Sequence, residues 1–369
     1  MKFMHIADVH LGADPDAGMF ADVDRGVEIR DTFEKIIMRA RKEQGDLLLV
    51  AGDLFHRQPL VRELREVDYL FREVFGRPVV LIAGNHDYIK AASNYRTFKW
   101  SDNVHLLMGD DTTGRLDRIY LENLNTEVYG FSYTAKEITA PLYRNARPEK
   151  NGRIHILLAH GGDAKHIPVT PSDLAATGFD YIALGHIHKP GIVVPGLAAY
   201  AGAPEPADHN DLGRHGVIIG EIRQGQDCRI AFLPMAKREY RHEELVLTEE
   251  DTNGSISHRI REHMAELGDA DLYKWTLTGF HHAEMLPDTA RLLQEPHVFE
   301  VLDRTRPAWE IAKLQAEHRE DMIGIFIESF LKAGDEAEGG TEAGTENTGN
   351  GLSRLEEEAL YAGLEAMLT

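Results

Sequence analysis

Five short apolar runs within residues 1–190 end directly in side chains that can bind a metal ion. The clearest is PVVLIAGNHD, in which the apolar residues stop at Gly84 and are followed by Asn85, His86 and Asp87. Such runs are typical of strands buried on both faces of a parallel sheet. The carboxyl ends of parallel strands meet at one edge of a sheet, where ligands bind. We therefore expect alternating strands and helices whose coordinating residues converge at one site.

The other four runs end in the same kinds of side chain. Imidazole and carboxylate groups without a thiolate favour Mn, Fe or Zn over Mg or Ca. So many ligands suit two ions bridged by a shared carboxylate better than one ion. Gly52, Gly84 and Gly185 each precede a candidate ligand, and a residue without Cβ allows the backbone to approach such a site closely. The additional candidates are Asp8 and His10 in ADVH, Asp53 in GD, His160 in AH, and His186 and His188 in GHIH.

Composition narrows the class of protein. The single cysteine, Cys228, excludes a disulfide framework and a cysteine-based metal cluster, and it fits a reducing cytoplasm. The first ten residues lack the apolar core of a signal peptide, and no apolar stretch reaches the ~18 residues of a membrane span. A formal net charge of -21 argues against broad, nonspecific nucleic-acid binding but is compatible with a local basic groove or a metal site. We expect a cytoplasmic protein without a membrane span.

The pattern of the sequence changes near residue 240. Residues 1–239 alternate between strand-like and helix-like runs, which predicts the metal-binding α/β domain. The remainder is divided by composition and periodicity into four parts. We expect a small α/β capping module at 240–306, one amphipathic helix at 307–333, a disordered Gly/Glu/Thr-rich linker at 334–351, and a terminal helix at 352–369 for docking on a partner.

The five motifs, in the order D-x-H, GD, GNH[DE], H and GHxH, resemble those of the calcineurin-like metallophosphoesterase superfamily over roughly residues 1–235. Their flanks are similar to the SbcD/YhaO type of DNA repair exonuclease. These flanks are ADVHLG at 7–12, GDLFH at 52–56 and YAGAPEPADHNDLGRHGVIIGEI at 200–222. The resemblance implies a four-layer α/β/β/α sandwich and two divalent ions, expected to be Mn²⁺ with Fe or Zn as alternatives.

The resemblance also implies a role for each candidate. His86 would face the phosphate and assist the reaction without binding an ion. His56 would lie near the substrate phosphate, and Asp87 would either orient the His86 ring or cap a turn. One ion would be held by Asp8, His10, Asp53 and His188, and the other by Asp53, Asn85, His160 and His186.

The leading hypothesis is a Mn²⁺-dependent DNA exonuclease that hydrolyses phosphodiester bonds through two-metal activation of water. The resemblance implies a role in DNA repair with an SMC-like coiled-coil ATPase of the SbcC kind, and it is compatible with a homodimer. Basic runs at 236–242 and 258–262 are candidates for DNA contacts. Two alternatives remain open: a phosphodiesterase or phosphatase acting on a small nucleotide or a phosphoprotein, and a scaffold subunit of an ATPase complex.

Overall fold

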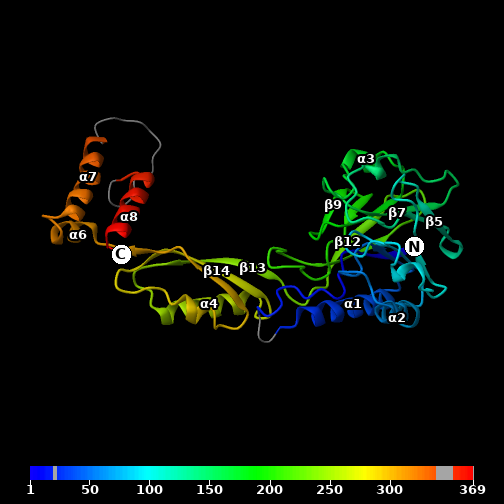
Figure 1. Cartoon of the computed structure of the whole chain (residues 1–369), viewed down its shortest axis with the longest axis horizontal. Coiled ribbons are helices and arrows are strands. Elements are labelled where there is room, and N and C mark those ends of the chain that lie inside the picture. The colour runs from blue at the N-terminus through cyan, green and yellow to red at the C-terminus, as the bar shows by residue number, and fades with distance from the viewer. Residues whose placement is uncertain (20–22, 338–351, 369) are drawn as a thin grey trace. The chain divides into compact units, whose positions relative to one another are not determined.

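The computed structural model describes residues 1–19, 23–337 and 352–368. The chain divides into two compact units, whose elements can be followed in Figure 1. The first unit comprises Met1–Arg241 and Ala270–Leu272, and the second comprises His242–Asp269 and Tyr273–Thr369. The first unit thus continues past residue 239, where the sequence predicted a boundary.

The first unit contains two six-stranded mixed sheets. In the first sheet the order is β12-β11-β1-β2-β3-β4, with β1 to β4 parallel and β11 and β12 added as antiparallel neighbours. Its strands β2 and β3 are apolar and buried along their whole length, as the sequence predicted. The strands are β1 (Lys2–Ile6), β2 (Leu47–Ala51), β3 (Val79–Ile82), β4 (Val104–Leu106), β11 (Gly216–Glu221) and β12 (Arg229–Pro234).

The second sheet has the order β5-β6-β7-β8-β10-β9. Its four central strands are parallel, and an antiparallel strand closes each edge. The strands are β5 (Asp117–Leu121), β6 (Thr126–Gly130), β7 (Ile154–His160), β8 (Tyr181–Gly185), β9 (Gly191–Val194) and β10 (Ala198–Tyr200).

Side-chain alternation along the strands separates the layers of the first unit. On β2, Leu49 faces the second sheet, whereas Leu48 faces the helices α1 (Arg25–Lys42) and α2 (Val61–Tyr69). The outer face of the second sheet is covered by α3 (Pro171–Ala175) and adjoining loops, on the side of the unit opposite α1 and α2 (Figure 1). The layers are helix, sheet, sheet and helix, which confirms the predicted four-layer sandwich.

Strand register aligns the strand ends that carry the motifs within each sheet. Ala51 at the end of β2 pairs with Ile82 at the end of β3, so the segments that follow leave the same edge. In the second sheet, His160 pairs with Gly185, the residue before His186. The motifs are far apart in sequence, and this register makes them neighbours.

The second unit is built on a smaller sheet of order β13-β14-β15, with β16 paired to β14. Helix α4 (Asn253–Leu267) packs on it through Ile256 and Ile260, against Trp275 in the middle of β14. The other elements are β13 (Tyr240–Leu247), β14 (Leu272–His282), α5 (Thr289–Leu292), β15 (Val298–Asp303) and β16 (Arg306–Ala308).

The prediction of a single helix at 307–333 is wrong. Pro307 lies in β16, and the helical region is divided into α6 (Ile311–Glu317) and α7 (Met322–Ala337). Asp321 separates these two helices, because its carboxylate accepts the backbone N–H of Ile323 at 2.9 Å and so caps the start of α7. Residues 334–337 of the expected linker are helical, and the rest of it, 338–351, lies outside the described residues.

The terminal helix α8 (Arg354–Leu368) packs against α6 and α7. Leu360 and Leu364 are fully buried in a cluster with Ile311 and Ile327. The apolar face of α8 is therefore largely covered by its own chain. Among the described residues, no helix is both long and apolar enough to cross a membrane.

Candidate metal centre

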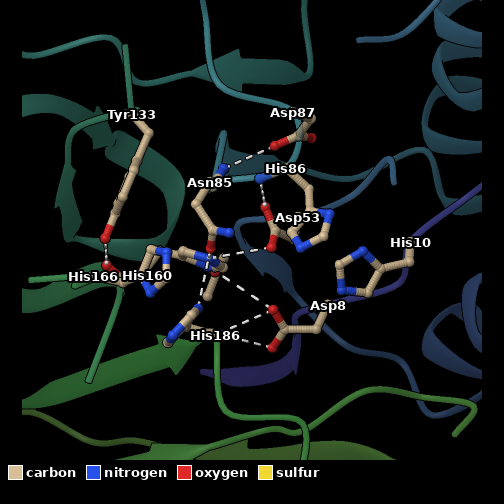
Figure 2. Close-up of polar contacts among 12 residues, drawn as sticks. Asp8, His10, Asp53, Asn85, His86, Asp87, Tyr133, His160, His166 and His186 are labelled. Carbon is tan, nitrogen blue, oxygen red and sulfur yellow. Dashed lines mark hydrogen bonds and ion pairs between the residues drawn. The ribbon is translucent and has the colours of Figure 1, made fainter. Parts of the chain in front are cut away.

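The predicted ligands converge where the two sheets end together. Asp8, Asp53 and Asn85 follow β1, β2 and β3, and His160 is the last residue of β7. Figure 2 shows their polar atoms turned toward a common point, with His186 beside them. Of the predicted ligands, five are at most 4 % exposed: Asp8, His10, Asp53, Asn85 and His160. Desolvation on this scale is costly for charged groups unless they bind a partner of opposite charge.

Four of the predicted ligands have a strained backbone. Asp8, His10, Asp53 and His186 have φ angles of 51°, 52°, 49° and 97°, in the left-handed region that residues with a Cβ rarely adopt. Such conformations cost on the order of 1–3 kcal/mol each and persist only where the surrounding structure imposes them. The packed sheets therefore hold these side chains in directions that a relaxed strand end would not give.

The glycines before the ligands permit this close approach, as the sequence predicted. A Cβ at Gly84 would lie 2.3 Å from Oδ1 of Asp53, and one at Gly52 would lie 2.4 Å from Nδ1 of His160. At Gly185 it would lie 2.1 Å from the carbonyl oxygen of Ala51. No side chain fits at these three positions without displacing the site.

One group of potential ligands consists of Asp8, His10 and His188. The Nε2 atoms of His10 and His188 face each other at 3.1 Å. Ligand atoms about 2.1 Å from a shared ion lie about 3.0–3.4 Å apart at octahedral or tetrahedral angles. The separation of the two nitrogens fits a shared ion.

A second group surrounds the amide oxygen of Asn85. This oxygen lies 2.9 Å from Nε2 of His160 and 3.0 Å from Nδ1 of His186. Asp53 lies between the groups, because its Oδ2 is 3.4 Å from His160 Nε2 and it also belongs to a group with Asp8. This arrangement fits the bridging position predicted for Asp53.

The hydrogen bonds at the far side of the second group favour a cation beside Asn85. Nδ1 of His160 lies 2.9 Å from the carbonyl oxygen of Ala51, which can only accept, so Nδ1 carries the proton. In a neutral ring, Nε2 then presents a lone pair to the amide oxygen of Asn85, which is also an acceptor. Facing acceptors repel unless a proton or a metal ion lies between them. The donor set therefore fits a divalent ion.

The ionisation of the site follows from burial and from its carboxylates. Burial raises the pKa of Asp8 to about 6. Although burial opposes it, the carboxylates of Asp53 and Asp8 raise the pKa of His160 to about 9. Burial lowers the pKa of His10 to about 3 and that of His186 to about 4, so both rings are neutral and available as ligands near neutral pH. The raised pKa of His160 shows that the carboxylates attract a positive charge to this position.

His86 and His56 lie on the His10 side of the centre. The rings of His86 and His56 are 4.8 Å and 5.4 Å from the His10 ring. His86 is anchored through its backbone N–H, which donates to Oδ1 of Asp53 at 2.8 Å. His56 is exposed and His86 is half-buried. Both rings are thus close to the candidate ions and accessible to a substrate.

Asp87 does not have the contacts expected of a group that orients His86. Its carboxylate accepts the backbone N–H of Gly84 at 2.8 Å, the backbone N–H of Phe55 at 3.2 Å and the hydroxyl of Tyr95 at 2.8 Å. It therefore fastens the loop that carries Asn85 to the one that follows Asp53. The alternative prediction, that Asp87 caps a turn, describes its role better.

Several side chains that support the ligands were not among the predicted site residues. The hydroxyls of Tyr133 and Tyr143 lie 2.9 Å and 3.4 Å from the carbonyl oxygen of His160. Asp163 and Asp211 contact the outer ring nitrogens of the two GHIH histidines. Metal-binding histidines usually donate their other ring N–H to a carboxylate or carbonyl, so such partners were to be expected, but no sequence signal identified these two aspartates.

Comparison with known proteins agrees with this geometry. Residues 1–190 match the family model of the calcineurin-like phosphoesterases. The chain belongs to this family. Members of the calcineurin-like phosphoesterase family bind divalent metal ions, and the Asp/His groups described above are candidates to hold them here. The family predicted from the five motifs is confirmed.

Relatives within the family include proteins named as nucleases or as repair proteins. The chain is 29% identical to the metallophosphoesterase YhaO of Bacillus subtilis, over 53% of this chain and 52% of the relative. It is 30% identical to the DNA double-strand break repair protein Mre11 of Methanocaldococcus jannaschii, over 57% and 58% of the two chains. It is 25% identical to a subunit of the nuclease SbcCD of Staphylococcus epidermidis, over 71% and 75%. The chain thus spans little more than half of the length of the first two relatives.

The shared carboxylate yields a first prediction. Asp53→Ala should lose both ions, because Asp53 lies between the two ligand groups, whereas His188→Ala should keep the ion at Asn85. Elemental analysis of protein equilibrated with Mn²⁺ should give two ions per chain for the natural sequence, none for Asp53→Ala and one for His188→Ala. Two ions bound to Asp53→Ala would show that Asp53 is not the bridge.

Proposed function

We propose that this protein is a Mn²⁺-dependent DNA nuclease of the exonuclease type that acts in DNA repair in the cytoplasm. The observation that carries the proposal is the convergence of two ligand groups on Asp53, with His86 and His56 beside them. The name of the relative Mre11 supports DNA as the substrate, and that of SbcCD supports a nuclease. In this proposal Asp8, His10, Asp53 and His188 hold one ion, and Asp53, Asn85, His160 and His186 hold the other.

His86 is placed to assist the departure of the leaving oxygen. Its Nδ1 lies 3.3 Å from the carbonyl oxygen of His56, which only accepts, so Nδ1 is the donor in this bond. Nε2 is then left for the substrate, and in the protonated ring it can give a proton to the leaving oxygen. The exposed His56 ring, 5.0 Å from that of His86, is placed to contact the same phosphate. Bound divalent ions would polarise the phosphate and lower the pKa of the attacking water.

The basic runs suggested as DNA contacts are largely neutralised within their own unit. In the first unit, Lys237 and Arg238 pair with Glu28 at 3.2 and 2.6 Å. In the second, Arg259 and Arg261 pair with Asp251 and Glu295 at 2.8 and 3.3 Å. These four basic side chains are therefore paired with carboxylates. The positive charge that attracts a phosphate diester would therefore come mainly from the bound ions.

We further propose that the helices α6 to α8 form the surface that binds an SMC-like coiled-coil ATPase. Met322 and Ile325 lie one turn apart on α7 and are 75% and 63% exposed. Leu355 on α8 is 76% exposed. Amphipathic helices with exposed apolar anchors commonly lie against a partner helix or groove. Since α8 packs on α6 and α7, the three helices would act together and not through α8 alone.

The activity is tested with purified protein on linear duplex DNA, single-stranded DNA and bis-p-nitrophenyl phosphate, with and without Mn²⁺. We expect Mn²⁺-dependent release of nucleotides from DNA ends, and none from Asp53→Ala. Hydrolysis of the small diester without cleavage of DNA would support an enzyme for small substrates. Two bound ions with no hydrolysis of any substrate would support the scaffold role.

Replacement of His86 separates catalysis from metal binding. His86→Ala should bind both ions normally, because the ring is not among the proposed ligands. Its rate should fall by about 10²–10⁴-fold, the usual contribution of a general acid. Elemental analysis and single-turnover cleavage on the same preparation provide the two readouts. Loss of an ion from His86→Ala would make His86 a ligand and contradict its assigned role.

The docking surface is tested by charge substitution on α7. Ile325→Glu, alone and with Met322→Glu, should reduce co-purification of the ATPase by at least about tenfold, since a buried charge costs several kcal/mol without a partner. Leu286→Glu is the matched control, because Leu286 is 77% exposed but lies outside the three helices. Removal of residues 334–369 is less suitable because it also removes Leu360 and Leu364 from the cluster. Equal recovery of the ATPase with all variants would exclude this surface.

A further inference from the structure

Two aspartates outside the five motifs contact the two histidines of GHIH. Nε2 of His186 lies 2.8 Å from Oδ2 of Asp163, and Nδ1 of His188 lies 3.0 Å from Oδ2 of Asp211. Each aspartate is 23 positions from its histidine, one before it in sequence and the other after it. Each contact is made by the ring nitrogen that faces away from the ligand groups.

The carboxylate of Asp163 is fixed by its own loop. Its Oδ1 accepts the backbone N–H groups of Lys165 and His166 at 2.7 and 2.9 Å. The ring of His166 also contacts this carboxylate, through Nδ1 at 2.9 Å. These bonds set the direction of Oδ2 toward His186. The carboxylate is therefore oriented before any ion is bound.

Asp211 is held in a comparable way. Its Oδ2 accepts the backbone N–H of Ala207 at 2.9 Å, and its carbonyl oxygen lies 3.1 Å from Nε2 of His215. This loop belongs to the stretch 200–222, which lies beyond the five motifs in the sequence. The contact with His188 therefore links the loop before β11 to the candidate metal centre.

The two aspartates select opposite tautomers. A carboxylate accepts, so His186 carries its proton on Nε2 and leaves Nδ1 for the group at Asn85. For the same reason His188 carries its proton on Nδ1 and leaves Nε2 to face His10. The two histidines are only two residues apart, yet they present different nitrogens to the centre.

We infer that Asp163 and Asp211 are positioning residues that each fix the ring and the tautomer of one GHIH histidine, so that each governs a different ion. This inference rests on the proposed pair of ions. Asp163 would act on the ion held with Asn85 and His160, and Asp211 on the ion held with Asp8 and His10. Partners of this kind typically change metal affinity by about 10–100-fold.

The test measures Mn²⁺ binding by titration calorimetry in Asp163→Asn and Asp211→Asn. Each variant should weaken one of the two ions by about 10–100-fold and leave the other unchanged. Asp208→Asn is the matched control, because Asp208 lies in the same loop as Asp211 and its carboxylate accepts from the backbone N–H of Asn210. The control should bind both ions as the natural sequence does.

Double variants identify the histidine through which each aspartate acts. Asp163→Asn should add nothing to the loss of affinity caused by His186→Ala, but its effect should persist in full in His188→Ala. Asp211→Asn should show the reverse pattern. Full additivity of Asp163→Asn with His186→Ala would overturn the inference, and so would unchanged affinity for both ions in either aspartate variant.

A second readout does not depend on metal or on activity. Nitrogen-15 spectra of the metal-free protein, at a pH where both rings are neutral, distinguish the tautomers of His186 and His188. We expect an Nε2–H tautomer for His186 that is lost in Asp163→Asn, and an Nδ1–H tautomer for His188 that is lost in Asp211→Asn. If the natural protein bound no ion, the proposed function would fail while this tautomer result could still stand.

The same experiments test whether Asp163 is instead a ligand of a separate ion. Asp163, His166 and His186 are close enough to hold an ion by themselves. Three ions in the natural protein and two in Asp163→Asn would assign the aspartate to a separate ion site and overturn its positioning role. Asp163 is 47% exposed, so its replacement by asparagine is expected to leave the fold intact, and thermal melting checks this.

Discussion

The candidate metal centre depends on hydrogen-bond acceptors that face one another. The amide oxygen of Asn85 meets ring nitrogens of His160 and His186 at 2.9 and 3.0 Å, while the outer nitrogens of both rings are already bonded to acceptors. Such an arrangement favours a cation among the facing lone pairs, either a proton on His160 or a metal ion. Nearby carboxylates strengthen the demand, which is why the pKa of His160 is raised to about 9 although the ring is buried. The protein thus maintains a position that a positive charge must fill.

The rest of the first unit holds these ligand atoms close together. Left-handed backbone at Asp8, Asp53 and His186 is tolerated because the strands that precede these residues are buried on both faces and register-locked to their neighbours. The glycines at 52, 84 and 185 allow the backbones of the two sheets to approach until the ligand atoms touch. The apolar core between the sheets therefore makes the strands rigid. This rigidity keeps the strand ends in strained backbone conformations and the ligand atoms closely packed.

The fold class and the identity of the converging side chains could be predicted before the structure was known. Apolar runs that stop at Gly-Asp, Gly-Asn-His or Gly-His-Ile-His specify both a buried parallel strand and the chemistry at its end. The meeting of Asp53, Asn85 and His160 was expected from them, whereas the four-layer sandwich was implied by the family resemblance. The helices on either side of Asp321 were harder to separate. The first ends at Glu317, and the side chain of Asp321 caps the start of the second at Met322.

How the ligands are held could be learned only from the folded chain. Asp163 and Asp211 lie 23 positions from their histidines in opposite directions along the chain, so no local spacing connects them, and only the packing of separate loops brings their oxygens to the rings. Asp87, next to His86 in sequence, turns instead to Tyr95 and to the backbones of Gly84 and Phe55. The groups present at a strand end are readable from the sequence, because they follow from the order of residues along one strand. The direction of each ring and the choice of its free nitrogen depend on partners from other strands and loops, which come together only after the chain has folded.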